Sequence, residues 1–183
     1  MLLGALGLKF KTAIANADEA DFFGSTVRET VEENARRKAT TLLPGIAPGD
    51  VLITADTLVA MDGRVMSKPK DRDEALAHLR AFSGGTHEVL TGMALSSRTK
   101  PQRVSCTSTL VSFRHLSQAE IEAYADSPEP YDKAGGYGIQ GIACLFVSKV
   151  EGSYSNVMGL PTETLLRELE AYTGITPADW LKK

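Results

Sequence analysis

The sequence is poor in cysteine and histidine. It contains two cysteines, Cys106 and Cys144, and three histidines among 183 residues. Two cysteines in a chain of this length do not make a disulfide framework, and both lie in apolar, strand-like segments, so we expect two reduced core thiols. The histidines, His78, His87 and His115, lack the spacing of metal ligands. These residue types therefore predict neither a disulfide-stabilised scaffold nor a histidine metal centre.

An excess of positive charge and a long hydrophobic run are also missing. The formal net charge of −3 argues against binding to a nucleic-acid polymer or a membrane surface, which needs a basic excess. No run approaches the roughly 18 apolar residues of a membrane span. The start, MLLGALGLKF, has neither the basic region nor the cleavage site of a signal peptide. We therefore expect a cytoplasmic protein, and a small phosphorylated ligand held by a few lysines remains compatible with this charge.

The hydrophobic pattern predicts a mixture of helices and strands. Capping boxes, each a threonine or serine followed three residues later by glutamate, begin helices at Thr26 and Ser117. Asp62-Gly63 is typical of a hairpin turn. The other expected elements are a short helix that ends at Gly7, helices from about Asp71 and from Pro161, and strands over residues 51–60, 87–95, 104–113 and 143–150. This order predicts an α/β fold in one domain over residues 1–183, with a mixed, twisted sheet and flanking helices.

Glycine is concentrated in one part of the chain. Six of the sixteen glycines fall between residues 132 and 161, where two glycine-rich turns flank an apolar segment. Glycine lets backbone approach a ligand closely or turn through positive φ, so we expect a binding wall of backbone N–H groups that suits an anionic or planar ligand. The segment from Gly136 to Gly141 matches G-x-G-x-x-G. It lacks the preceding strand and following helix of a dinucleotide site, which excludes that interpretation.

Asp56 is the first candidate for chemistry. It interrupts an apolar strand in Ala55-Asp56-Thr57, and a buried carboxylate without a metal, a cation or a proton is costly. It is therefore either a metal ligand or general base, or a carboxylate that caps backbone at a strand bend.

Lysines and a glutamine are the next candidates. Lys68 precedes a proline, which favours an extended backbone, and is either a phosphate ligand or an ordinary surface lysine. Lys38 lies beside the apolar stripe of its helix and either extends to solvent or pairs with Asp56. Lys133 and Gln140 bracket the first glycine turn. The Gln140 amide can read a base edge or satisfy loop backbone.

One buried acid, several lysines and glycine-rich backbone fit the metal-assisted attack of water on a phosphoanhydride. Mg²⁺ typically uses one or two carboxylates together with phosphate oxygens of the substrate. We expect Asp56 and Glu19 as the metal-associated carboxylates, with Mg²⁺ or Mn²⁺ as the divalent cation.

These residues together resemble the Maf family of nucleoside triphosphate pyrophosphatases. The matching segments are collinear and cover nearly the whole chain: Leu2-Leu3, Gly7, Phe10, Asp18-Glu19, Lys38-Ala39, Ala55-Asp56-Thr57, Lys68-Pro69, Ser83-Gly84, His87, Val89, Thr91-Gly92, 132–141 and 152–161. The resemblance implies an α/β fold with two lobes around a cleft. It also implies hydrolysis of a nucleotide to its monophosphate and pyrophosphate with a divalent cation, usually by a homodimer.

The resemblance also implies residue roles. Asp56 is similar to the catalytic base or metal-associated acid of the family, Lys38 and Lys68 to phosphate-binding residues of the catalytic site, and Thr57 and Gln140 to residues that determine base specificity. Lys133 is expected beside them as a substrate-binding residue. The segments DKAGGYGIQG and GSYSNVMGLP resemble those of the branch that prefers dTTP and UTP. The alternatives are a purine-type house-cleaning pyrophosphatase and a non-catalytic nucleotide-binding or cell-division regulatory protein.

The start of the sequence departs from the family pattern. Family members carry a strand and a Ser-x-Ser-Pro-Arg-Arg-like turn before the Leu-Leu helix, and this turn contacts the triphosphate. The printed sequence begins with Met1-Leu2-Leu3. Arginine makes strong charge-assisted contacts with phosphate, so we expect this sequence to be weakly active or inactive compared with a version extended upstream.

Overall fold

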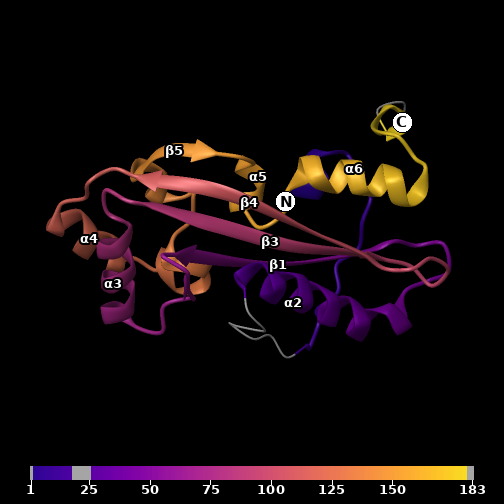
Figure 1. Ribbon diagram of the computed structural model, residues 1–183, viewed down its shortest axis with the longest axis horizontal. Helices are drawn as coiled ribbons and strands as arrows, with labels where there is room; N and C mark the ends of the chain where they lie inside the picture. The colour runs from indigo at the N-terminus through magenta and orange to yellow at the C-terminus, as the bar shows by residue number, and fades with distance from the viewer. Residues whose placement is uncertain (1, 18–25, 181–183) are drawn as a thin grey trace.

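A computed structural model describes residues 2–17 and 26–180. A five-stranded sheet lies at the centre of this structure, and Figure 1 shows its long strands. The strand order is β2-β1-β3-β4-β5, and every neighbouring pair in this described sheet is antiparallel. The strands are β1 (Leu52–Met61), β2 (Arg64–Met66), β3 (Thr86–Ser96), β4 (Arg103–Phe113) and β5 (Val147–Glu151). The predicted α/β class with flanking helices is confirmed. The pairing differs from the expected mixed sheet because hairpins and returning connections, rather than parallel crossovers, join the strands.

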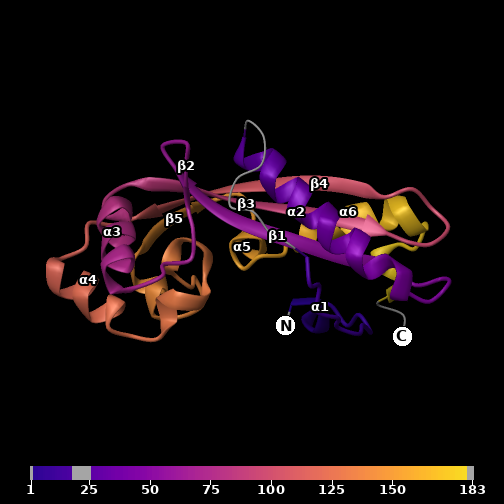
Figure 2. The ribbon, with the colours of Figure 1, turned by 90° about the horizontal axis from the view of Figure 1, so that it is seen from below.

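Helices cover both faces of the sheet. In Figure 1, α2 (Val27–Leu42) lies below the long strands and α6 (Thr162–Thr173) lies above them. Figure 2 shows α3 (Arg72–Phe82) and α4 (Gln118–Ala125) together at the opposite end from α6. The short elements are α1 (Leu2–Ala5), η1 (Leu43–Gly45), η2 (Glu129–Asp132), η3 (Ala134–Gly136), η4 (Ile142–Leu145), α5 (Tyr154–Val157) and α7 (Pro177–Trp180).

The alternation of side chains along β3 explains the two layers. Leu90 and Ala94 pack in the clusters formed with α2, whereas Met93 and Leu95 pack with α6 on the other face. Successive side chains of a strand point to opposite faces. The apolar residues of β3 therefore hold a helix on each side of the sheet.

Helix α2 lies unusually close to the sheet. Its predicted capping box is present, since Thr26 accepts a hydrogen bond from the backbone N–H of Glu29 while the Glu29 side chain accepts one from Thr26. At Gly92, an added Cβ would lie 2.2 Å from the carbonyl oxygen of Val31. Gly92 is also the register partner of Asp56 on β1. A residue without a side chain is thus required where α2 crosses the strand that neighbours Asp56.

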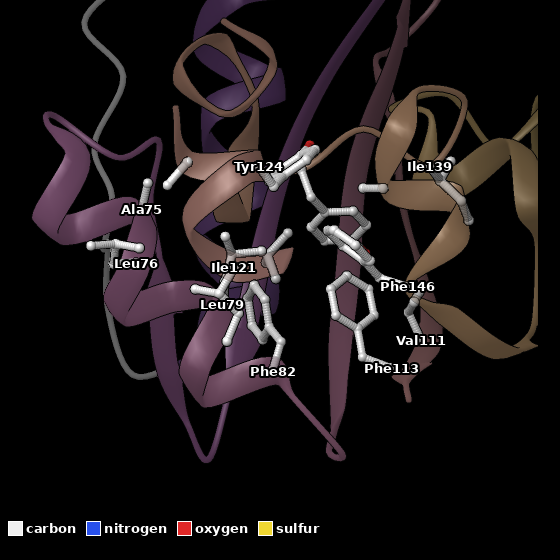
Figure 3. Close-up of a cluster of buried hydrophobic side chains, with 14 of the residues drawn as sticks. Ala75, Leu76, Leu79, Phe82, Val111, Phe113, Ile121, Tyr124, Ile139 and Phe146 are labelled. Atoms are coloured by element: carbon white, nitrogen blue, oxygen red, sulfur yellow. The ribbon is translucent and has the colours of Figure 1, made fainter. Parts of the chain in front are cut away.

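An aromatic core fixes the glycine-rich segment against one end of the sheet. Figure 3 shows Phe82 from α3 and Phe113 from β4 in the same cluster as Ile139 and Phe146. The Phe113 ring lies edge-on to those of Phe146 and Tyr137, with centroids 6.0 and 5.0 Å away. The glycine-rich backbone is therefore anchored by the apolar side chains that interrupt it.

Two expectations for this region are wrong. The strand expected over residues 143–150 begins only at Val147, because residues Ile142–Leu145 form the 3₁₀ helix η4. In this helix Ala143 is buried and Cys144 is exposed, so Cys144 is not a core thiol. Cys106 is half-buried, and burial raises the pKa of its thiol to about 11. Both cysteines are free, but neither is fully buried.

Candidate functional site

A cavity of about 630 Å³ brings the predicted site residues together. Its walls come from α2, β1, residues 67–70, the glycine-rich residues 133–141 and residues 157–159. The predicted residues that line it are Lys38, Asp56, Thr57, Lys68, Lys133 and Gln140. Glu19 lies outside the described residues. The volume is within the range of small-molecule sites, so the cavity can accommodate a nucleotide-sized ligand.

Asp56 is held by two side chains of α2. Its Oδ1 accepts a hydrogen bond from Lys38 Nζ at 2.7 Å, and its Oδ2 accepts one from Asn34 Nδ2 at 2.9 Å. Lys38 Nζ also donates to the carbonyl oxygen of Ala55 at 3.1 Å. The Asp56 side chain is 7% exposed and that of Lys38 is 16% exposed. This geometry matches the charge-partner interpretation, because Asp56 is paired with a cation instead of capping backbone.

Asn34 was not among the predicted site residues. It lies four residues before Lys38, and positions four apart share one face of a helix. This spacing was the available signal, but it is a weak one, because every helical residue has a neighbour four positions away. Only the fold shows that the shared face of α2 meets Asp56.

Positive charge dominates the cavity. Four lysines and one carboxylate are its charged residues in the described part of the chain: Lys38, Lys68, Lys70, Lys133 and Asp56. Lys68 and Lys70 are exposed and flank the buried Pro69. Lys133 Nζ lies 2.5 Å from Asp132 Oδ1 and lowers the pKa of that carboxyl group. A positive cavity in a chain with a net charge of −3 favours an anionic ligand.

Lys70 was missed by the sequence interpretation. It follows Lys68 by two residues in a segment without helix or strand. Side chains two apart in an extended backbone point the same way. The Lys-Pro-Lys spacing was therefore a usable signal for a second cationic side chain.

Thr57 lies on the opposite face of β1 from Asp56. Its Oγ1 is 2.8 Å from Oγ1 of Thr91, its register partner on β3. Among the described residues β2 pairs only with Val59–Met61, so the outer edge of β1 beside Asp56 and Thr57 carries no strand. The cavity can therefore include both residues although they face opposite ways.

Tyr137 supports the glycine-rich wall from within. It lines the cavity, and its hydroxyl lies 2.7 Å from His87 Nε2. Burial lowers the pKa of His87 to about 4 and raises the pKa of Tyr137, so both groups are neutral near pH 7. The flanking Gly136 has a φ of 75°, which glycine adopts without strain. Sequence reasoning did not select Tyr137, although its position between two glycines was a signal.

The donor set is compatible with one divalent cation. In the described residues, Asp56 is the cavity's single carboxylate, and no group of three histidine, cysteine, aspartate or glutamate side chains comes together. Each Asp56 oxygen accepts one N–H donor and retains a lone pair. Mg²⁺ is commonly held by one or two carboxylates with substrate phosphate oxygens. The site therefore fits a cation bound together with a phosphorylated ligand.

The cavity combines four lysines with one buried carboxylate and is bordered by glycine-rich backbone, a combination that suits a small anionic ligand. Residues 1–172 match the family described as Maf-like protein, and the chain belongs to this family. The family resemblance of the sequence is thus confirmed.

Several relatives are bacterial proteins named dTTP/UTP pyrophosphatase. The one from Hahella chejuensis is 45% identical over 174 residues, which cover 91% of this chain and 85% of the relative. The one from Syntrophomonas wolfei is 42% identical over 161 residues, covering 87% and 85%. The one from Bacillus pumilus is 40% identical over 176 residues, covering 96% and 92%.

Proposed function

We propose that this protein is a nucleoside triphosphate pyrophosphatase that hydrolyses dTTP and UTP to the monophosphate and pyrophosphate. The observation that carries the proposal is the buried Asp56–Lys38 pair, at 2.7 Å, inside a lysine-lined cavity. The shared name of the relatives supports the same substrate class. A purine nucleotide and a non-catalytic binding role are the competing functions.

We assign different steps of this reaction to different residues of the cavity. Lys38 and Lys68 bind and neutralise the phosphates, with Lys70 as a further cation. Asp56 orients a water molecule, accepts its proton or holds the cation. The water oxygen bonds to the α-phosphorus while Asp56, acting as the base, accepts the water proton. The bond from the α-phosphorus to the bridging oxygen of the β-phosphate breaks, and pyrophosphate leaves with that oxygen. Fixed charge aimed at the phosphates stabilises the charge that develops in this step.

A divalent cation, Mg²⁺ or Mn²⁺, would supply further neutralisation of the phosphate oxygens and bind beside Asp56. Glu19 as a second ligand stays a prediction, since it lies outside the described residues. On the nucleoside side, the proposal assigns Thr57 and Gln140 to the base and Lys133 to the substrate.

Replacement of Asp56 tests the proposal. We expect Asp56→Asn to lower the rate of pyrophosphate release from dTTP with Mg²⁺ by about 100-fold or more, the scale of losing a general base. Asp62→Asn is the matched control, because Asp62 occupies an exposed turn with φ of 51° that asparagine tolerates. The assay uses dTTP, UTP, CTP and purine triphosphates.

Three other results of this assay would argue against parts of the proposal. Equal rates for wild type and Asp56→Asn would remove Asp56 from the chemistry. A faster rate with purines would support the purine-type function, and tight nucleotide binding without any turnover would support the non-catalytic role.

The assembly, the domain organisation and the location stay predictions. The homodimer is checked by light scattering, and the single domain by one cooperative unfolding transition.

In residues 2–17 and 26–180 no helix has the length and apolar character needed to cross a membrane.

A further inference from the structure

Thr91 is a buried threonine directly behind the cavity. It is 0% exposed and is not part of the cavity lining. Its Oγ1 lies 2.8 Å from Thr57 Oγ1 and donates to the backbone carbonyl oxygen of Asn156 at 3.3 Å. Thr91 is therefore the middle member of a chain of hydrogen bonds that begins at the cavity surface.

The direction of this chain follows from proton counting. A hydroxyl group has one proton, and a carbonyl oxygen can only accept. When the Thr91 hydroxyl donates its hydrogen bond to the carbonyl oxygen of Asn156, it has no proton left for Thr57. The Thr57 hydroxyl must then be the donor in the bond between the two threonines. This arrangement makes both hydrogen bonds, whereas the reverse direction gives up the bond to Asn156. Thr57 consequently presents only lone pairs to the cavity.

The far end of the chain is fixed in place. The Asn156 side chain is 0% exposed, and its Nδ2 donates to the carbonyl oxygen of Val89 at 2.9 Å and to Thr109 Oγ1 at 3.0 Å. These bonds hold the residue whose carbonyl orients Thr91. The acceptor is thus a rigid part of the fold.

We propose that Thr91 is a positioning residue that fixes Thr57 as a hydrogen-bond acceptor and thereby selects a base with a donor at this point. Uracil and thymine carry an N3–H donor, whereas cytosine carries an unprotonated N3. The inference rests on the proposed function. Gln140 cannot make this distinction by itself, because its amide can either donate or accept. A fixed acceptor can reject cytosine, since two facing acceptors leave a polar group unpaired.

The test compares Thr91→Val with Thr91→Ser. Valine has nearly the same shape as threonine but no hydroxyl, so it releases the Thr57 proton toward the ligand. We expect Thr91→Val to lower the UTP-to-CTP ratio of kcat/KM by about tenfold, the scale of one hydrogen bond. Thr91→Ser retains the hydroxyl and should retain the wild-type ratio.

A second background shows whether the effect passes through Thr57. In a Thr57→Val variant, adding Thr91→Val should leave the ratio unchanged, because no hydroxyl remains to be oriented. Thermal unfolding of each variant confirms that it is folded. If valine prevents folding, Thr91→Ala provides the same loss of the hydroxyl.

The outcomes separate the two proposals. Failure of the wild type to hydrolyse dTTP and UTP would count against the proposed function. A wild type that hydrolyses UTP but does not prefer it over CTP, or a ratio that Thr91→Val leaves unchanged, would overturn the role of Thr91.

Discussion

Asp56 shows how a single buried carboxylate can be kept in a largely apolar strand. Both of its oxygens receive N–H donors from α2, one of them charged. Such pairing offsets the cost of taking the carboxylate out of water. The sequence predicted that Asp56 needs a partner and named Lys38 as a candidate. It could not predict the contacts of Asn34 with Asp56 or of Thr57 with Thr91, because both depend on how distant segments pack together.

His87 provides a prediction about pH. Its pKa is about 4 in the fold, because of burial, against about 6.5 in an unfolded chain. As the pH falls below 6.5, the unfolded chain takes up a proton that the folded protein does not, so the free energy of unfolding decreases toward pH 4. Between pH 7 and pH 5 we expect His87 to contribute a loss of about 2 kcal/mol.

His87→Gln isolates this contribution. Glutamine does not titrate, and its amide can still bond the Tyr137 hydroxyl. Urea unfolding at pH 7 and pH 5 should therefore show a smaller loss in the variant, while the carboxylates titrate alike in both proteins. An equal loss would show that His87 is not responsible for it.

At the scale of elements, the contact between α2 and the sheet determines the geometry of the site. Helix α2 carries Asn34 and Lys38, and it reaches Asp56 because Gly92 leaves room for the backbone at Val31. The sequence predicted this helix, its cap and its apolar stripe, because these depend on local patterns. It could not predict that Gly92 lies beneath the helix, since that contact joins distant parts of the chain.

Gly92→Ala tests this dependence. The new Cβ would lie 2.2 Å from Val31 O, so α2 must move away from the strand. We expect a loss of about 1–3 kcal/mol in stability, the usual cost of overpacking. A lower kcat should accompany it, because Lys38 and Asn34 move with the helix. Thermal unfolding and the pyrophosphate assay measure both effects.

Gly45→Ala is the matched control. A Cβ there meets nothing within 4 Å, so stability and rate should stay near the wild-type values. If Gly92→Ala behaves like Gly45→Ala, the close approach of α2 is not important for the site.

The short helix η4 shows where local patterns fail. Residues 143–150 were expected to form one apolar strand, yet only residues within Val147–Glu151 pair with β4. A short apolar run does not distinguish a strand from a buried helical turn. Phe146 packs into the aromatic core (Figure 3). Ala143 belongs to the same buried cluster, and these tertiary contacts decide the local conformation.

For the whole molecule, the important property is a positive cavity in an acidic protein. The lysines come from α2, residues 67–70 and the glycine-rich segment, which lie far apart in the sequence. The sequence identified most of these cations, but only the fold shows that they surround one space. Positive charge gathered around one cavity raises the local concentration of an anion there, and salt weakens this effect.

We therefore expect kcat/KM for dTTP to fall by about threefold between 0.05 and 0.3 M NaCl. A variant with Lys68→Gln and Lys70→Gln should start from a lower value and depend less on salt. Lys149→Gln is the control, because Lys149 lies on β5 outside the cavity lining and pairs with Glu151 at 2.8 Å. A salt dependence equal to the wild type in the double variant would contradict the role of these lysines.

Because Asp56 and Thr57 lie on opposite faces of β1, substitutions can change the surroundings of one residue without changing those of the other. The two residues are consecutive in β1, but Asp56 contacts α2 while Thr57 contacts Thr91 on the opposite face. Substitutions around Thr91 and Asn156 can therefore alter one surface of the sheet without disturbing the packing of α2 on the other. A mutant library confined to that surface is the rational starting point for evolving acceptance of a new nucleobase while hydrolysis is retained.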